Sequence, residues 1–459
     1  MSLRLSFYGG AGKVTGSNFL IESSNEKILV DCGIEQGIDF NGSDASEPFP
    51  YDVKTIDALV VTHAHLDHIG RIPKLVRDGF LGKIYMTPPT RDLSELILRD
   101  SVHILAEEAK RYDRTPLYEE QDVDAMFSLV EILDYHTEKQ ITSTFSIYLR
   151  NTGHILGSAS VRITDGETSV ALTGDIGNCP SPLLPDWEPI NDADAIVMES
   201  TYGDRVHEQK NRVERLRDIL SKAIAKNGAI LIPAFSMERT QLMLYGLSNF
   251  FDAGELPKIP VFLDSPLAIK ITAVYEKWGN TYFKKETEDE MKREGSIFEF
   301  PFLKKTLSRD ESTEIEKIPN PKIIIAGAGM SHGGRIGKWG TLYLPEQSTT
   351  LIMVGYQAPG SPGRHMAEGS SSVRLNGADV QIKAKIETLD GWSAHADRDQ
   401  LLKFAEASLP RTKTIFTAMG EPSSERFLAQ RIHDYLGVRA IVPEFGQTWE
   451  ITKDSVGKV

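Results

Sequence analysis

Cysteine is scarce in this sequence: only Cys32 and Cys179 occur among 459 residues. Two cysteines exclude a disulfide scaffold, and their scarcity favours a reducing cytoplasm. Long apolar runs are absent as well. None approaches the roughly 18 residues that a membrane-spanning helix needs, and the first residues lack the apolar core of a signal peptide. We therefore expect a cytoplasmic protein without a membrane segment.

Basic residues are outnumbered by acidic ones: the sequence has 51 lysines and arginines and 65 aspartates and glutamates, which gives a net charge of -14. This balance argues against indiscriminate binding to nucleic acid, since the global field repels a polyanion. It still allows a polyanionic substrate, because bound divalent metals and a basic cleft reverse the sign locally. The length predicts two domains.

The middle of the chain alternates between helical and strand patterns. We expect a helix at 211–227, a strand at 229–233, a helix at 238–251 and a strand at 261–263. This alternation predicts a parallel sheet with crossover helices. Before it, residues 145–173 have the pattern of short successive strands.

Four strong metal ligands, His63, His65, Asp67 and His68, directly follow the apolar run 56–62. The run has the length and β-branched content of a buried strand, and helical spacing follows it, so the ligands lie on a strand-to-helix turn. Two imidazoles two residues apart can hold one ion, while the carboxylate and the third imidazole face a second. Such ligands suit zinc, with manganese or iron as alternatives. A solvated loop without metal is the other interpretation, but strong ligands rarely cluster after a buried strand. The pattern predicts a metallohydrolase.

A site for two ions needs further ligands. His154 lies in a glycine-flanked turn, and Asp175 ends an apolar strand, where its carboxylate can point into a pocket. The alternatives are a hydrogen-bonded turn histidine and a simple turn former. Glu199 also ends a strand, and its alternative interpretation is an ordinary ion-pair partner. His395 precedes a helix, and its alternative interpretation is part of a capped helix start. If they meet, the glutamate favours a charged imidazole, which suits a general acid.

These motifs resemble those of the β-CASP group of metallo-β-lactamase-fold nucleases, which includes the endonuclease of pre-mRNA 3′-end processing and its bacterial and archaeal single-chain homologues. The matching positions are Asp31, the stretch from His63 to His68, His154, Asp175, Glu199 in Glu-Ser-Thr-Tyr-Gly, and His395 in Ser-Ala-His. Other similar stretches are Pro-Ala-Phe-Ser-Met-Glu-Arg-Thr-Gln from residue 233, Leu-Asp-Ser-Pro-Leu-Ala from 263, Gly-Met-Ser-His-Gly-Gly-Arg from 329 and Gly-Tyr-Gln-Ala-Pro-Gly from 355. The resemblance covers nearly all of the chain. It indicates the nucleic-acid branch over β-lactamases, glyoxalases and lactonases, which lack an inserted domain.

The resemblance implies an α/β protein, a metallo-β-lactamase αββα sandwich with an inserted parallel α/β (β-CASP) domain. We expect the sandwich to comprise residues 1–205 and 381–459, and the inserted domain residues 206–380. The active site would lie in the cleft between the two domains. A homodimer is compatible with the group.

The resemblance also implies a ribonuclease that hydrolyses phosphodiester bonds of single-stranded RNA. Six side chains would hold two zinc ions, or manganese ions: His63, His65 and His154 the first, Asp67 and His68 the second, with Asp175 bridging. A hydroxide activated by the metals and oriented by Asp67 would attack phosphorus. His395, charged by Glu199, would protonate the leaving 3′ oxygen.

Three further residues have expected roles outside the metal shell. Asp31 resembles a carboxylate that fixes a metal ligand from behind. Arg335 and Arg364 lie in glycine-rich turns, and arginine offers paired donors to phosphate. Surface arginines without such a role are an equally good interpretation of these two.

The sequence departs from the group at its last motif, a histidine in His-Gly-Glu that completes the second ion's shell. Here the strand 414–418 leads into Met419-Gly420-Glu421. A neutral thioether is a poor ligand for zinc or manganese, so the second site is weakened. Three outcomes stay open: a slower nuclease, a one-metal site with altered chemistry, or an RNA-binding accessory protein without cleavage. The six retained ligands and the Glu199–His395 pair favour retained activity.

Overall fold

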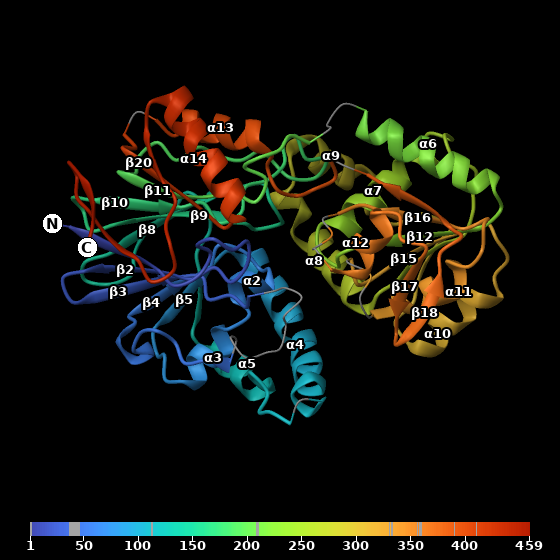
Figure 1. Ribbon diagram of the computed structural model, residues 1–459, viewed down its shortest axis with the longest axis horizontal. Coiled ribbons are helices and arrows are strands. Elements are labelled where there is room, and N and C mark those ends of the chain that lie inside the picture. Colours follow the sequence, from blue (N-terminus) through green and yellow to red (C-terminus); the bar gives the residue numbers. More distant parts are fainter. Residues whose placement is uncertain are drawn as a thin grey trace. The chain divides into compact units, whose positions relative to one another are not determined.

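The computed structural model (Figure 1) describes residues 2–35, 46–111, 113–207, 211–329, 331, 334–355, 357, 360–389, 391–409 and 411–459. The chain divides into two units, one of Met1–Val206 with His395–Val459 and the other of His207–Ala394. The second unit is therefore an insertion into the first. Whether the functional domains end at the predicted residues 205 and 380 stays a prediction.

Two mixed sheets form the first unit. Their strand orders are β23-β22-β1-β2-β3-β4-β5-β6 and β21-β20-β11-β10-β9-β8-β7. The strands of the first sheet are β1 Leu3–Phe7, β2 Phe19–Ser23, β3 Glu26–Val30, β4 Ala58–Val60, β5 Lys83–Met86, β6 Val130–Ile132, β22 Thr448–Ile451 and β23 Val456–Lys458. Those of the second are β7 Glu138–Gln140, β8 Ser146–Asn151, β9 Ala159–Thr164, β10 Ser169–Leu172, β11 Ala195–Glu199, β20 Thr414–Ala418 and β21 Arg439–Ile441.

The two sheets pack face to face. One buried apolar cluster contains Phe7 and Phe19 from the first sheet and Leu149, Val161 and Phe416 from the second. Every residue of β4, β10, β11 and β20 is buried. Strands covered on both faces are uniformly apolar rather than alternating, which explains the short apolar runs in the sequence.

Helices cover the outer faces of both sheets (Figure 1). The first sheet carries α2 Leu66–Ile69, α3 Ile72–Arg77, α4 Pro88–Arg111 and α5 Glu120–Ser128, and the second carries α13 Arg398–Ala407 and α14 Pro422–Leu436. Leu59 of the first sheet joins Leu75 and Met126 of the helices in one cluster. Ile415 joins Leu428 in another. The predicted αββα sandwich is confirmed.

The second unit is built on a parallel sheet with the order β14-β13-β15-β12-β16-β19. Every pair of neighbouring strands in it is parallel, as predicted. Its strands are β12 Ala229–Pro233, β13 Val261–Asp264, β14 Leu303–Lys305, β15 Lys322–Ala326, β16 Thr350–Met353 and β19 Lys385–Thr388, and a separate hairpin is formed by β17 Ser372–Leu375 and β18 Ala378–Gln381.

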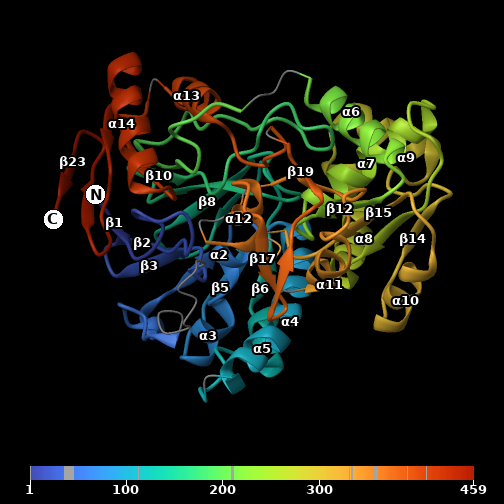
Figure 2. The ribbon, with the colours of Figure 1, turned by 45° about the vertical axis from the view of Figure 1, so that its right-hand side comes forward.

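Helices surround this sheet in Figure 2, where α6 lies against β12. They are α6 Arg212–Ala225, α7 Arg239–Asp252, α8 Pro266–Tyr282, α9 Lys285–Glu294, α10 Arg309–Glu314, α11 Gly334–Tyr343 and α12 Pro362–Ala367. Single 3-10 turns occur at Val53–Thr55 and Ile315–Lys317. Among the described residues, no helix is both long and apolar enough to cross a bilayer.

Glu26, at the start of β3, joins the two sheets of the first unit. Its carboxylate accepts hydrogen bonds from Ser143 Oγ at 2.5 Å, from Thr144 N at 2.9 Å and from Thr142 Oγ1. These donors lie between β7 and β8 of the other sheet. Burial alone would raise the pKa of Glu26, but the hydrogen bonds outweigh it and lower the pKa from 4.5 to about 2.

Replacing Glu26 by glutamine should therefore lower the free energy of unfolding by about 1 kcal/mol at neutral pH, a value reduced for solvent screening. The pKa of the folded state is depressed, so this stability is complete above about pH 4.5 and is lost as the pH falls toward 2. Urea unfolding of wild type and Glu26→Gln across the acid range measures the difference. A difference that stays constant with pH would contradict the assignment.

Candidate metal centre

The predicted metal ligands lie where strands of the first unit end. The stretch from His63 to His68 follows β4 and runs into α2. Asp175 follows β10, and Glu199 is the last residue of β11. His154 lies in the turn between β8 and β9. The predicted strand-to-helix turn is present, and it directs side chains from one short segment toward the ends of the neighbouring sheet.

Four side chains bring one nitrogen or oxygen atom each to a common point. His63 Nε2 lies 3.0 Å from His65 Nδ1, and His154 Nε2 lies 3.2 Å from the same atom. Asp175 Oδ2 lies 3.3 Å from both His63 Nε2 and His154 Nε2. Three of these side chains are buried, and His65 is half-buried.

The spacing of these four atoms fits a zinc ion. A tetrahedron with bonds of about 2.0–2.1 Å to nitrogen and oxygen has edges of about 3.3–3.4 Å. The observed separations of 3.0–3.3 Å match such edges. Three ring nitrogens and one carboxylate oxygen at this spacing form a donor set that could hold a cation.

A second, looser set shares Asp175 with the first. His68 Nε2 lies 3.5 Å from Asp175 Oδ1 and 3.9 Å from Asp67 Oδ2. The two oxygens of Asp175 therefore face different sets, Oδ2 the first and Oδ1 the second. This is the arrangement that a carboxylate bridging two ions needs.

Asp31 holds the second set from behind. Its carboxylate accepts hydrogen bonds from His68 Nδ1 at 2.6 Å and from both Thr62 N and Thr62 Oγ1 at 2.8 Å. Because Nδ1 of His68 is bound to Asp31, its Nε2 is the nitrogen directed toward Asp67 and Asp175. Thr62 was not among the predicted residues, although it directly precedes His63 and could have been found from that position.

The protonation states of the first set suit cation binding. Burial lowers the pKa of both His65 and His154 well below the usual value, and the neutral imidazole is the form that binds metal. Burial would raise the pKa of Asp175, but the charge of His68 above all outweighs it and keeps the pKa low. Burial disfavours a charged His68, yet the carboxylates of Asp175 and Asp31 raise its pKa. The same negative charge would hold a metal ion.

Glu199 and His395 meet beside the first set. His395 Nδ1 lies 3.3 Å from Glu199 Oε2 and 3.8 Å from Asp175 Oδ2. The Glu199 side chain is fully buried, and its Oε1 accepts a hydrogen bond from Ile176 N at 2.5 Å. A single β-bridge between His395 and Gly177 holds the histidine near the site.

Met419 lies close to the residues that support the second set. Its sulfur lies 3.8 Å from Ser17 Oγ, which in turn lies 3.3 Å from Asp31 Oδ2. The side chain is 1% exposed and joins the core between the two sheets. The backbone at Met419 has φ of 52°, a left-handed conformation in which histidine is enriched and long apolar side chains are rare.

Arg335 and Arg364 lie in the second unit. The Arg335 guanidinium pairs with Asp264 and donates to Thr306 O at 3.0 Å and Leu307 O at 2.7 Å. Arg364 pairs with a residue of its own helix turn, Glu368. These bonds give Arg335 a structural role, and a phosphate contact from either arginine stays a prediction.

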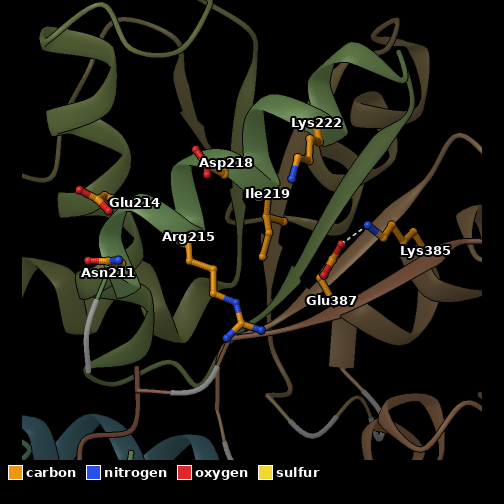
Figure 3. A pocket seen from close by; sticks show the side chains of 8 residues that line it. All are labelled: Asn211, Glu214, Arg215, Asp218, Ile219, Lys222, Lys385 and Glu387. Atoms are coloured by element: carbon orange, nitrogen blue, oxygen red, sulfur yellow. Dashed lines mark ion pairs between the residues drawn. The ribbon is translucent and has the colours of Figure 1, made fainter. Parts of the chain in front are cut away.

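The second unit also carries a groove of about 430 Å³ between α6 and the edge strand β19 (Figure 3). Its lining mixes basic and acidic side chains: Arg215 and Lys222 share α6 with Glu214 and Asp218, and Lys385 pairs with Glu387 of the same strand. Arg215 also donates to Thr388 O at 3.0 Å. The balance of charge favours no class of ligand, and none of the predicted site residues lines this groove.

Three protein families match the chain in succession. The metallo-beta-lactamase superfamily matches residues 11–217, the Beta-Casp domain residues 240–366, and the Zn-dependent metallo-hydrolase RNA specificity domain residues 379–443. The chain belongs to the β-CASP group of metallo-β-lactamase-fold ribonucleases. This group is a zinc-dependent metallo-hydrolase family, and the four-ligand set described above is a candidate metal site of that family.

Relatives of the β-CASP group extend over nearly the whole chain. Ribonuclease TTHA0252 of Thermus thermophilus is 34% identical over 88% of this chain and 91% of its own length. An RNase J-like protein of Methanocaldococcus jannaschii is 32% identical over 96% of this chain and 98% of its own. Transcription termination factor FttA of Pyrococcus horikoshii is 32% identical over 96% and 70%, respectively.

A solved structure shares the fold alone. It is a protein of unknown function from Enterococcus faecalis, 11% identical, with a TM-score of 0.52 and covering 98% of this chain and 100% of its own.

Replacing Arg335 by alanine should cost about 3 kcal/mol of stability, because Asp264 is fully buried and would lose its only cationic partner among the described residues. Arg364→Ala is the matched control, since its pair with Glu368 is exposed and is worth about 0.3–0.5 kcal/mol. Urea unfolding of both variants measures the losses. Equal losses would contradict the structural role of Arg335.

Proposed function

We propose that this chain is a metal-dependent ribonuclease that hydrolyses phosphodiester bonds of single-stranded RNA. The observation that carries the proposal is the Asp175 carboxylate, which faces two sets of ligand atoms, one with each oxygen. Membership of the β-CASP group supports RNA as the substrate.

The residues would hold two ions unequally. His63, His65, His154 and Asp175 would bind the first zinc ion tightly, because their atoms already have tetrahedral spacing. The second set has wider spacing, and position 419 holds methionine rather than histidine, so its affinity for zinc or manganese would be lower. When bound, the ions would polarise the phosphate and make water nucleophilic near neutral pH.

The remaining chemistry belongs to side chains of this chain. Asp67, with 18% of its side chain exposed, lies where it can orient the attacking water and accept its proton. As the new oxygen–phosphorus bond forms, the bond from phosphorus to the 3′ oxygen breaks. His395 would donate a proton to that 3′ oxygen, and Glu199 would hold the imidazole in its charged form. The products are a 5′-phosphate and a 3′-hydroxyl.

The direct test is cleavage of end-labelled single-stranded RNA in the presence of zinc or manganese. Asp67→Ala should reduce the rate by about a hundred-fold or more, because it removes the group that orients the nucleophile. Asp310→Ala, which removes an exposed carboxylate at the start of α10 in the second unit, is the control and should behave as wild type. RNA binding without cleavage by wild type would reject the ribonuclease and favour an accessory RNA-binding protein.

Met419→His tests the second ion. We expect purified wild type to retain about one ion per chain and Met419→His about two, with faster RNA cleavage, because an imidazole replaces a poor thioether ligand. Elemental analysis after gel filtration gives the count. Met419→Leu keeps the side-chain volume without adding a ligand and should match wild type. If Met419→His changed neither the ion count nor the cleavage rate, position 419 would not be what limits the second site.

A further inference from the structure

Next to His395, the first unit places an aromatic side chain and then a guanidinium. The ring of Tyr202 lies 6.0 Å from the ring of His395, nearly edge-on. The guanidinium of Arg205 lies 5.6 Å from the centre of the Tyr202 ring. Arg205 is half exposed, and Tyr202 is largely buried. The candidate general acid is therefore the first member of a stack rather than an isolated side chain.

A second alternation of aromatic rings and a guanidinium lies along α14. The guanidinium of Arg431 lies 5.1 Å from the centre of the Phe427 ring and 5.3 Å from that of the Tyr435 ring. A spacing of four residues places the three side chains above one another on one face of the helix. Tyr435 is 66% exposed. From Phe427 to Tyr435 the helix rises about 12 Å.

The two halves are joined by packing between the turn after β11 and α14. Ser424 Oγ lies 3.2 Å from Asp204 Oδ1 and 3.5 Å from Thr201 O. Gly203 fits so closely that a Cβ added to it would lie 2.9 Å from Leu428 Cβ. This packing places the turn that carries Tyr202 and Arg205 beside the helix that carries Phe427, Arg431 and Tyr435. These five residues, here called the stacking row, all belong to the first unit.

Alternating rings and guanidiniums suit a single-stranded nucleic acid. Bases stack on aromatic and guanidinium planes, and guanidiniums also pair with phosphates. The acidic neighbours Asp204, Glu421 and Asp434 keep this surface from being strongly positive. Stacking, rather than net charge, would therefore supply most of the affinity. The region that matches the RNA specificity domain, residues 379–443, includes α14.

We propose that the stacking row binds the nucleotides on the 5′ side of the scissile phosphate. The proposal rests on the proposed function, because the direction follows from His395. The 3′ oxygen that His395 protonates belongs to the 5′-side fragment, so that fragment leaves past His395 and Tyr202. The 12 Å between Phe427 and Tyr435 would accommodate about three to four stacked nucleotides at about 3.4 Å each.

The first test measures affinity without cleavage, in the Asp67→Ala background, by anisotropy of a fluorescein-labelled single-stranded oligoribonucleotide. Tyr435→Ala should weaken binding about ten-fold, the typical loss of one stacking ring. Phe445→Ala is the matched control, because Phe445 is also an aromatic residue that is 66% exposed; it should bind as the background protein does. Arg431→Gln should lower the slope of log affinity against log salt by about 0.7, the value for one phosphate contact on a single strand.

Equal affinity of the Tyr435→Ala and Phe445→Ala proteins would overturn the stacking row, and so would the absence of measurable RNA binding. A change in oligomeric state in Tyr435→Ala with unchanged RNA affinity would overturn it in favour of a protein contact.

The second test addresses direction. Abasic nucleotides are placed either 5′ or 3′ of the cleaved bond, and kcat/KM is measured for wild type and Tyr435→Ala. Abasic sites on the 5′ side should slow wild type, and Tyr435→Ala should be insensitive to them, because ring and base would act as one pair. A loss confined to 3′ abasic sites would overturn the direction.

The two proposals fail separately. RNA that binds through the stacking row but is not cleaved by wild type would reject the ribonuclease and keep the row. RNA that is cleaved by wild type, with unchanged affinity in the row variants, would reject the row alone.

Discussion

The Asp175 carboxylate lies buried among imidazole rings, and both sets of candidate ligands in the first unit are arranged around it. A buried carboxylate is stable only when positive charge or several donors surround it. Here His63, His154 and His68 supply ring nitrogens on two sides. The strands β4, β8 and β10 must therefore end at compatible levels for the ligand atoms to meet. The packing of the two sheets on their shared apolar core sets where these strands end. The geometry of the candidate metal centre therefore depends on the packing of the sandwich.

Much of this centre could be predicted from the sequence because its signals are local. The ligand-rich turn follows a short apolar strand directly, and Asp175 and Glu199 each follow or end a buried strand. Such strand ends can be predicted from the apolar run and the polar residue that follows it. The parallel sheet of the second unit was predictable for the same reason, since helix and strand patterns alternate along the chain without long interruptions.

Features that join distant segments were not predictable in this way. Glu26 binds residues 142–144, and Arg335 binds Asp264, yet nothing in either local sequence indicates the partner. Tyr202 and α14 are separated by more than two hundred residues and meet only because β11 pairs in parallel with β20. Position 419 is an intermediate case: the sequence revealed the missing histidine, but the left-handed backbone and the contact with Ser17 required coordinates.

The insertion of the second unit has a consequence for the order of synthesis. Residues 395–459 supply β20 and β21 to one sheet of the first unit and β22 and β23 to the other. They also carry His395, the partner of Glu199. A chain still emerging from the ribosome therefore carries the candidate metal ligands from His63 to Asp175 before either sheet is complete, and it gains His395 only after the whole inserted unit has been made. The contact between Glu199 and His395 and the pairing of β11 with β20 are therefore among the last features of the first unit that can form.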